Sequence, residues 1–326
     1  MNKITSDIDS SKKIAIFSHV SPDADALCSS FALKNIINQN FGIKFVDVFI
    51  DGEVGELYRP ILRDETICQS PYGKYDLAIV LDSPNLDRIG KYKSLVESIP
   101  HVINIDHHET NEKFGDDNYV SKFASSTAEL IYLISKGSHY SMDDKIAKQL
   151  YQGIITDTNC FTSFAISKRT FQVVSELLAY DFDAEAIKEY YFKNNSKAKT
   201  ILLSKALSSM KFYKGDKFIT MRIPYELFTK IGASFEDTFG IIDNGINVSG
   251  TEVCAILIEK EPSKIYVSLR SKGLVNVGEI VKKYGGGGSQ MVGAYQKEGN
   301  IKDIEQELVN DISPLLPDEE IPEFTF

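Results

Sequence analysis

The sequence contains no tryptophan, and among its 326 residues there are only five histidines and four cysteines. The cysteines are Cys28, Cys68, Cys160 and Cys254, and no two of them form a Cys-x-x-Cys pair. This spacing argues against a cysteine-based zinc site and predicts reduced thiols in a cytosolic protein. The absence of tryptophan excludes nothing about folding, because 16 tyrosines and 19 phenylalanines are available for an aromatic core.

Long apolar runs are also absent: no stretch of about 18 apolar residues occurs, and residues 1–11 are not followed by a signal-like apolar segment. We therefore expect a soluble, cytoplasmic protein without a membrane partner. Positive charge is scarce, since 36 Lys and Arg residues face 46 Asp and Glu residues, for a net charge of −10. This excess opposes binding to long duplex nucleic acid, so a nucleic-acid partner is expected to be short.

The first half of the chain alternates short β-branched or aliphatic runs with helical patterns, which is typical of a parallel α/β sheet. Helical spacing of apolar residues between the runs predicts the crossover helices that parallel strands require. The predicted strands are 14–17, 45–49, 77–81 and 102–105, and the predicted helices include 26–38, 128–135 and 143–155.

The second half predicts a separate, smaller domain of mixed α+β architecture. A polar cluster at 193–196 follows a helical stretch and is interpreted as a hinge. This places the domain boundary at residue 195, which gives domains 1–194 and 195–326. Strands are predicted near 217–222, 252–259 and 264–269, with helices between them.

Acidic and imidazole side chains follow the ends of the predicted strands, where ligands collect in open α/β sheets. His19, Asp23 and Asp25 lie within seven residues directly after the first strand. Asp82 ends the third predicted strand, the run Asp106-His107-His108 ends the fourth, and Asp157 follows the helix predicted at 143–155.

Taken together, these segments offer four carboxylates and two imidazoles without a thiolate. The six candidate metal ligands are His19, Asp23, Asp25, Asp82, His107 and Asp157. Such a donor set suits Mn²⁺ or Mg²⁺ better than structural zinc. Six ligands exceed the need of one open catalytic ion, so two ions sharing a carboxylate are predicted.

Each motif alone has a simpler interpretation. Asp25 could cap the helix that begins at Ala26, and the other residues could be solvated. However, three of the five histidines fall inside these motifs, which favours a metal site. His101 and His139 have no such partners and are interpreted as structural or solvated. The run of residues 125–127 before a predicted helix could bind a phosphate, although a helix N-cap is the preferred interpretation.

Together these motifs resemble the DHH phosphoesterases, and in particular the DHH/DHHA1 group that includes bacterial nanoRNases with 3'-phosphoadenosine 5'-phosphate (pAp) phosphatase activity. The resemblance extends over nearly the whole chain. It rests on residues 17–25 (FSHVSPDAD), 80–82 (VLD), 86–90 (LDRIG), 105–108 (IDHH), 155–158 (ITDT) and 284–288 (YGGGG).

The resemblance implies one metal ion held by His19, Asp23 and Asp82, and a second held by Asp25, Asp82, His107 and Asp157. It implies that His108 faces the substrate phosphate and that Asp106 orients the histidines. The expected catalytic residues are thus Asp82, Asp106 and His108. Two Mn²⁺ ions per site, with Mg²⁺ as the alternative, would activate the attacking water.

In the second domain, the resemblance implies a substrate-binding surface at Arg270, Ser271, Gly286, Gly287, Gly288 and Ser289. Glycines 285–288 are expected to precede a helix and to let backbone N–H groups approach an anion. The family pattern has a histidine where this chain has Ser289. Serine cannot carry a positive charge, so we expect substrate preference or pH dependence to differ from that of relatives.

The leading functional prediction is hydrolysis of short oligoribonucleotides, including dinucleotides such as pApA, to mononucleotides, or of pAp to AMP. An inorganic pyrophosphatase or exopolyphosphatase is one alternative, because these enzymes share the first-domain motifs. A nucleotide-binding module without catalysis is the other. Members of the group are often dimers, so a homodimer stays open. The sequence alone does not rank pAp against the oligonucleotides.

Overall fold

The computed structural model describes residues 2–42, 44–162 and 166–318, and the chain divides into two compact units, Met1–Asn194 and Asn195–Phe326. Each unit has its own sheet and its own hydrophobic core. Among the helices within the described ranges, none combines the length and apolar character needed to cross a bilayer.

The first unit is built on a five-stranded parallel sheet with the strand order β2-β1-β3-β4-β5. The four predicted strands are present, and a fifth, polar strand extends one edge. The strands are β1 (Lys13–Phe17), β2 (Phe45–Phe49), β3 (Leu77–Leu81), β4 (Val102–Asp106) and β5 (Asp117–Val120).

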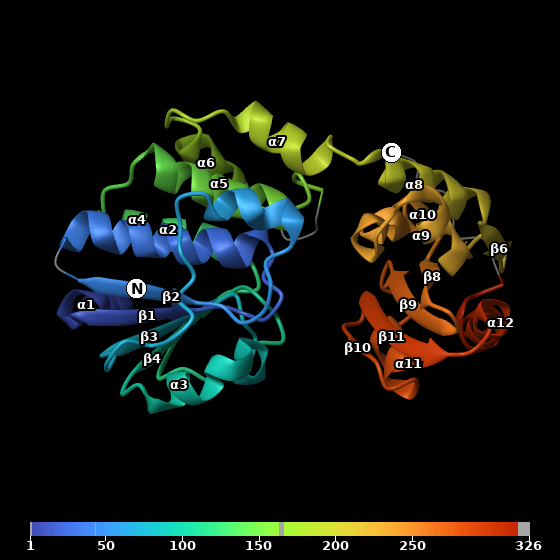
Figure 1. Cartoon of the computed structure of the whole chain (residues 1–326), viewed down its shortest axis with the longest axis horizontal. Helices are drawn as coiled ribbons and strands as arrows, with labels where there is room; N and C mark the ends of the chain where they lie inside the picture. Colours follow the sequence, from blue (N-terminus) through green and yellow to red (C-terminus); the bar gives the residue numbers. More distant parts are fainter. Residues whose placement is uncertain (1, 43, 163–165, 319–326) are drawn as a thin grey trace. The chain divides into compact units, whose positions relative to one another are not determined.

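Helices cover both faces of this sheet, with α2, α4 and α5 on one face and α3 on the other (Figure 1). Alternate residues of β1 therefore pack into two different cores: Ile14 and Ile16 on one face, Ala15 and Phe17 on the other. The helices are α1 (Asn2–Ser10), α2 (Ala24–Phe41), η1 (Glu56–Leu62), η2 (Leu86–Tyr92), α3 (Lys93–Ser98), α4 (Thr127–Gly137), α5 (Asp144–Asp157), α6 (Lys168–Leu177) and α7 (Ala184–Phe192).

The second unit has a mixed six-stranded sheet with the order β10-β11-β9-β8-β7-β6, in which only β7 and β8 pair in parallel. Its strands are β6 (Lys211–Tyr213), β7 (Phe218–Ile223), β8 (Val253–Glu261), β9 (Lys264–Ser271), β10 (Gly287–Gly288) and β11 (Val292–Glu298). Its helices are α8 (Lys197–Ser208), α9 (Tyr225–Ile231), η3 (Phe235–Thr238), α10 (Ile241–Ile246), α11 (Val277–Lys283), α12 (Ile301–Ile312) and η4 (Ser313–Leu315). The predicted fold class, a parallel α/β unit followed by a smaller α+β unit, is confirmed.

The expectation that glycines 285–288 precede a helix is wrong. They follow α11, and Gly287 and Gly288 form the short strand β10, which pairs with β11 at Ala294 and Gly293. A Cβ atom on Gly288 would collide with the backbone of β11, and one on Gly286 would do the same. These glycines therefore permit close packing of a hairpin, which the sequence pattern of a glycine run does not distinguish from an anion-binding loop.

Candidate metal centre

The acidic and imidazole motifs converge at the carboxyl edge of the first sheet. His19 follows β1, Asp82 follows β3, and His107 and His108 follow β4. Asp82 lies in the left-handed backbone region, with φ of 54°, and its N–H donates to the carbonyl of Ile105 at 3.0 Å. A non-glycine residue pays about 1–2 kcal/mol for this conformation, so the surrounding structure must hold it in place.

Asp82 lies between two histidines. Its Oδ2 is 3.5 Å from Nε2 of His19, and its Oδ1 is 3.5 Å from Nε2 of His107. The donor atoms of His19, Asp23 and Asp82 lie within 4.8 Å of one another. A second group with the same spacing consists of Asp25, His107 and Asp157. Two clusters of possible ligands thus meet at one buried carboxylate.

Asp25 is oriented by the N-terminus of α4. Its two carboxylate oxygens accept the backbone N–H groups of Thr127 at 2.7 Å and Ala128 at 2.9 Å. The alternative interpretation of Asp25 as a helix cap is wrong, because Asp23 caps α2 by accepting the N–H of Ala26 at 3.0 Å. Asp25 therefore stands within the first turn of α2, with its carboxylate fixed by a neighbouring helix.

The run at residues 125–127 has a structural role. Ser126 is the N-cap of α4 and accepts the N–H of Glu129 at 3.1 Å. The hydroxyl of Thr127 donates to Oδ1 of Asp82 at 3.0 Å. The preferred N-cap interpretation is confirmed, and the amides of Thr127 and Ala128 donate to Asp25.

Asp106 is fully buried and accepts three hydrogen bonds. The donors are the backbone N–H of His107 at 2.9 Å, Nδ1 of His108 at 2.7 Å and Nδ2 of Asn111 at 2.6 Å. The hydrogen bond to Asp106 fixes the imidazole of His108 through Nδ1, and Nε2 takes no part in it. Sequence reasoning did not single out Asn111, and its position in a polar loop carries no signal that distinguishes it.

Gly153 makes room for Asp25. A Cβ atom on Gly153, which lies inside α5, would approach Oδ1 of Asp25 to 2.8 Å and Cβ of Ala128 to 2.7 Å. A side chain at this position would therefore push against both a candidate ligand and the helix that orients it. The sequence contained no sign of this role beyond a glycine within a helical pattern.

Burial and mutual repulsion govern the charges of the cluster. Burial raises the pKa of Asp25 well above its usual value, and the charges of Asp82 and Asp157 add to the effect. Burial likewise raises the pKa of Asp157 to about 7, against the opposing charge of His107. For Asp82, the hydrogen bond from His19 and the nearby histidines outweigh burial and lower the pKa to about 2.

These shifts describe a buried set of oxygen and nitrogen donors with more negative charge than its histidines balance. A divalent cation would relieve this repulsion, and carboxylate oxygens and imidazole nitrogens are donors that such a cation accepts. The residues present therefore fit a metal centre.

A further cluster of possible ligands, separate from the candidate metal centre, lies at the amino ends of β4 and β5. Nε2 of His101 is 2.9 Å from Oδ2 of Asp117 and 3.3 Å from Oδ2 of Asp7, and Lys3 donates to Asp117 at 2.7 Å. His101, interpreted from the sequence as structural or solvated, thus has acidic partners that the sequence motifs did not predict. The partner Asp7 comes from α1, a helix that the sequence patterns did not predict.

In the second unit, Arg270 lies on β9 and pairs in register with Val292 of β11. Its Nη1 donates to Oγ of Ser268 at 3.3 Å and to the carbonyl of Leu269 at 3.2 Å. The backbone N–H of Ser289 donates to the carbonyl of Val292 at 2.7 Å. The structure thus brings Arg270 and the turn that carries Ser289 to neighbouring positions of one sheet, whereas Ser271 is buried.

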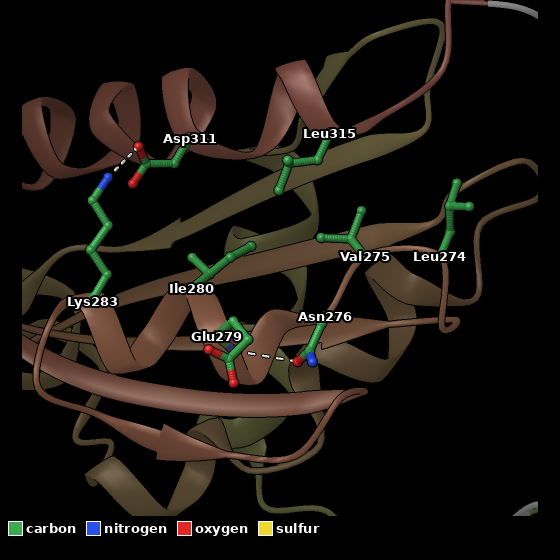
Figure 2. Close-up of a pocket in the computed structure, with 8 residues that line it drawn as sticks. All are labelled: Leu274, Val275, Asn276, Glu279, Ile280, Lys283, Asp311 and Leu315. Atoms are coloured by element: carbon green, nitrogen blue, oxygen red, sulfur yellow. Dashed lines mark hydrogen bonds and ion pairs between the residues drawn. The ribbon is translucent and has the colours of Figure 1, made fainter.

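A pocket of about 470 Å³ lies between α11, the C-terminal part of α12 and the segment that follows β9 (Figure 2). Its floor is apolar and includes Val275 and Ile280, while the ion pair of Lys283 with Asp311, 2.7 Å long, closes one end. Its eight lining residues include none of the predicted substrate contacts. The pocket therefore gives no support to the predicted substrate-binding surface.

The chain matches two family models, the N-terminal domain of the DHH family over residues 13–154 and the DHHA1 domain over residues 215–313. A relative from Streptococcus mutans, a probable bifunctional oligoribonuclease and PAP phosphatase NrnA, is 31% identical over 91% of this chain and 94% of its own length. The chain therefore belongs to the family of DHH proteins that carry a DHHA1 domain, and the resemblance drawn from the motifs is confirmed.

Two further proteins are similar to this chain over most of its length. The bifunctional oligoribonuclease and PAP phosphatase NrnA of Bacillus subtilis is 26% identical, and the match covers 84% of this chain and 86% of that protein. The crystal structure of an exopolyphosphatase-related protein from Bacteroides fragilis superposes with a TM-score of 0.87 at 24% identity, with 96% of each chain covered. At this identity the structural match establishes the fold alone.

Proposed function

We propose that the protein is a metal-dependent phosphoesterase that hydrolyses short oligoribonucleotides, including dinucleotides, to mononucleotides, and pAp to AMP. The observation that carries this proposal is the position of Asp82, whose two oxygens face His19 and His107 at the same distance of 3.5 Å. Such a carboxylate is suited to bridge two cations.

The ligand assignment follows the two clusters. His19, Asp23 and Asp82 would hold one ion, and Asp25, Asp82, His107 and Asp157 would hold the other, with Mn²⁺ as the expected metal. When bound, a pair of such ions supplies a water nucleophile at neutral pH and neutralises charge on the phosphoryl oxygens.

His108 has the properties of a phosphate donor. The hydrogen bond to Asp106 outweighs burial and raises the pKa of His108 to about 9, so the imidazole stays protonated at neutral pH. Because Nδ1 is engaged with Asp106 at 2.7 Å, the N–H at Nε2 is the one left for a phosphoryl oxygen. In this role His108 stabilises the charge that develops in the transition state, and Asp106 orients it.

The choice of substrate rests on the relatives. The matched proteins of S. mutans and B. subtilis are named as oligoribonucleases and PAP phosphatases, and both align over most of this chain. The DHHA1 match over residues 215–313 also favours the nuclease group that the sequence motifs resemble over the pyrophosphatase alternative. In the proposed function, Arg270, residues 286–288 and Ser289 form the substrate-binding surface of that domain, and the buried Ser271 supports it from beneath.

The test compares hydrolysis of pAp, pApA and a labelled 5-mer RNA by the wild type and two matched variants, with Mn²⁺ and with chelator. Asp82→Asn removes the shared carboxylate charge at nearly constant size, and we expect activity to fall by more than about 100-fold, with weaker Mn²⁺ binding in calorimetry. Asp303→Asn makes the same change at an exposed aspartate in the first turn of α12 and should leave activity unchanged.

Two results would contradict the proposal. Cleavage of pyrophosphate without cleavage of any of the three nucleotides would favour the pyrophosphatase alternative. Tight nucleotide binding without turnover at any Mn²⁺ concentration would favour the binding module, and Ser289→His would then be the next variant to measure.

A further inference from the structure

Beside the candidate metal centre, we propose that the ring of Phe123 is a stacking site for one nucleobase of an oligoribonucleotide substrate. This inference rests on the proposed function and assigns part of its substrate recognition to the first unit. Phe123 lies in the loop between β5 and α4, and it is 73% exposed.

The neighbours of Phe123 place its ring next to the DHH motif. Nζ of Lys122 lies 5.8 Å from the ring centroid of Phe123 and 2.5 Å from Oε1 of Glu109. Glu109 directly follows His108, the residue assigned to the substrate phosphate. A base stacked on Phe123 would therefore belong to a nucleotide close to the reacting phosphate.

The backbone carbonyl of Phe123 is held by a hydrogen bond from another residue of the first unit. The carbonyl of Phe123 accepts a hydrogen bond from Nη2 of Arg169 at 3.0 Å, and Nε of Arg169 donates to Oε1 of Glu129 at 2.6 Å. Glu129 is fully buried and also accepts the N–H and hydroxyl of Ser125 and the hydroxyl of Thr170. An exposed ring on a firmly bonded loop loses little conformational entropy when a flat ligand binds to it.

The same loop is joined to the metal ligands. Four residues after Phe123, the hydroxyl of Thr127 donates to Asp82 at 3.0 Å and its N–H donates to Asp25 at 2.7 Å. Phe123 thus lies four residues before a residue that contacts two candidate ligands. A base on Phe123 would be positioned relative to the site of hydrolysis.

The chemistry around the ring favours single-stranded RNA over a protein partner. Phe123 is one aromatic ring with the ammonium of Lys122 5.8 Å from its centroid, and this ammonium also pairs with Glu109. Single-stranded RNA is bound by such combinations, because every base stacks on an aromatic face and the phosphates seek positive charge. A protein partner would require a larger continuous apolar patch.

The experiment measures binding and hydrolysis of 5-mer RNAs in which one base at a time is replaced by an abasic ribose. In the wild type, loss of the base that stacks on Phe123 should weaken binding by about tenfold or more. In Phe123→Ala, the intact 5-mer should bind as weakly as that abasic RNA, and the abasic substitution should have no further effect. Phe123→Tyr should restore the wild-type pattern.

A matched control is Tyr72→Ala, which removes a ring that is 86% exposed and lies under Lys13, near the amino end of the sheet. This variant should retain the wild-type abasic profile. Binding is followed by fluorescence anisotropy with Ca²⁺ in place of Mn²⁺, so that the readout does not depend on turnover. Unchanged affinity of Phe123→Ala, or an abasic penalty that persists in it, would overturn the inference.

The outcome also separates this inference from the proposed function. Normal Mn²⁺-dependent RNA hydrolysis with an unchanged Phe123→Ala variant would retain the function and reject the stacking site. RNA binding that depends on Phe123 in a protein without phosphoesterase activity would retain the stacking site and reject the function.

Discussion

At the scale of single residues, the candidate metal centre depends on side chains that hold the ligands as much as on the ligands themselves. Asp25 is fixed by two amides of α4, and Asp106 holds His108 while Asn111 holds Asp106. Gly153 contributes by having no side chain where Asp25 passes α5. Such supporting residues determine whether the donors keep the geometry that a cation requires.

Gly153→Ala gives a direct test of this support. In an ordinary helix interior, glycine to alanine stabilises a protein by about 1 kcal/mol. Here the added Cβ meets Asp25 and Ala128 at less than 3 Å, so we expect lower thermal stability and weaker Mn²⁺ binding. Calorimetric titration and thermal unfolding would measure both effects.

Gly42→Ala is the matched control for this variant, because a Cβ atom on Gly42 meets nothing within 4 Å. It should leave Mn²⁺ affinity unchanged. If Gly153→Ala stabilises the protein and retains full Mn²⁺ affinity, Gly153 does not make room for Asp25 as described.

The sequence alone predicted that the metal-centre residues at the strand ends lie close together, because parallel strands present their carboxyl ends at one edge of the sheet. It did not indicate Asn111 or Gly153, and it named Thr127 only as part of a run that caps a helix or binds a phosphate. Their roles arise from contacts between segments far apart in the chain, such as Thr127 with Asp82, and no local pattern encodes those contacts.

At the scale of elements, α4 joins the metal centre to the outer helix α6. Two glutamates make this connection in different surroundings. Glu129 is fully buried and accepts hydrogen bonds from Arg169 and Thr170, whereas the side chain of Glu176 is 43% exposed and contacts Tyr132 and Lys136. The pair therefore compares a buried and an exposed acidic contact between the same two helices.

We expect Glu129→Ala to lower the free energy of unfolding by about 3 kcal/mol, because it leaves two buried hydroxyls and a guanidinium without their acceptor. Glu176→Ala should cost less than about 1 kcal/mol, since solvent screens its ion pair. Urea unfolding of both variants would measure the difference. Equal losses would show that burial of Glu129 is not what makes its contacts strong.

Elements were predictable to the extent that their sequences are apolar and regular. The four apolar strands of the first sheet were found within one residue of their observed ends. Strand β5, with the sequence Asp-Asn-Tyr-Val, was missed because it is short and polar at an edge of the sheet. Strand β10 was missed because Gly287 and Gly288 carry no strand propensity, and only their pairing with β11 defines it.

At the scale of the whole molecule, the candidate ligands all belong to one of the two compact units. They come from residues 19–157, inside the unit that ends at Asn194. A cation that binds only the folded site would therefore stabilise the first unit without adding contacts to the second.

If 1 mM Mn²⁺ is about 100 times its dissociation constant, it should raise the unfolding temperature of the first unit by about 5–10 °C. The unfolding temperature of residues 195–326 should not change. Differential scanning calorimetry with Mn²⁺ and with chelator would measure both transitions, and Asp82→Asn should abolish the shift. An equal shift of both transitions would contradict a site confined to the first unit.

This confinement has a consequence for synthesis of the chain. The last of the six candidate ligands in sequence order is Asp157, and the first unit is complete at residue 194 of 326. On the proposed assignment, the ribosome delivers every metal ligand before it begins the second unit. Loading with Mn²⁺ is thus expected on the nascent chain, and a shortage of the metal during translation would affect the protein before its release.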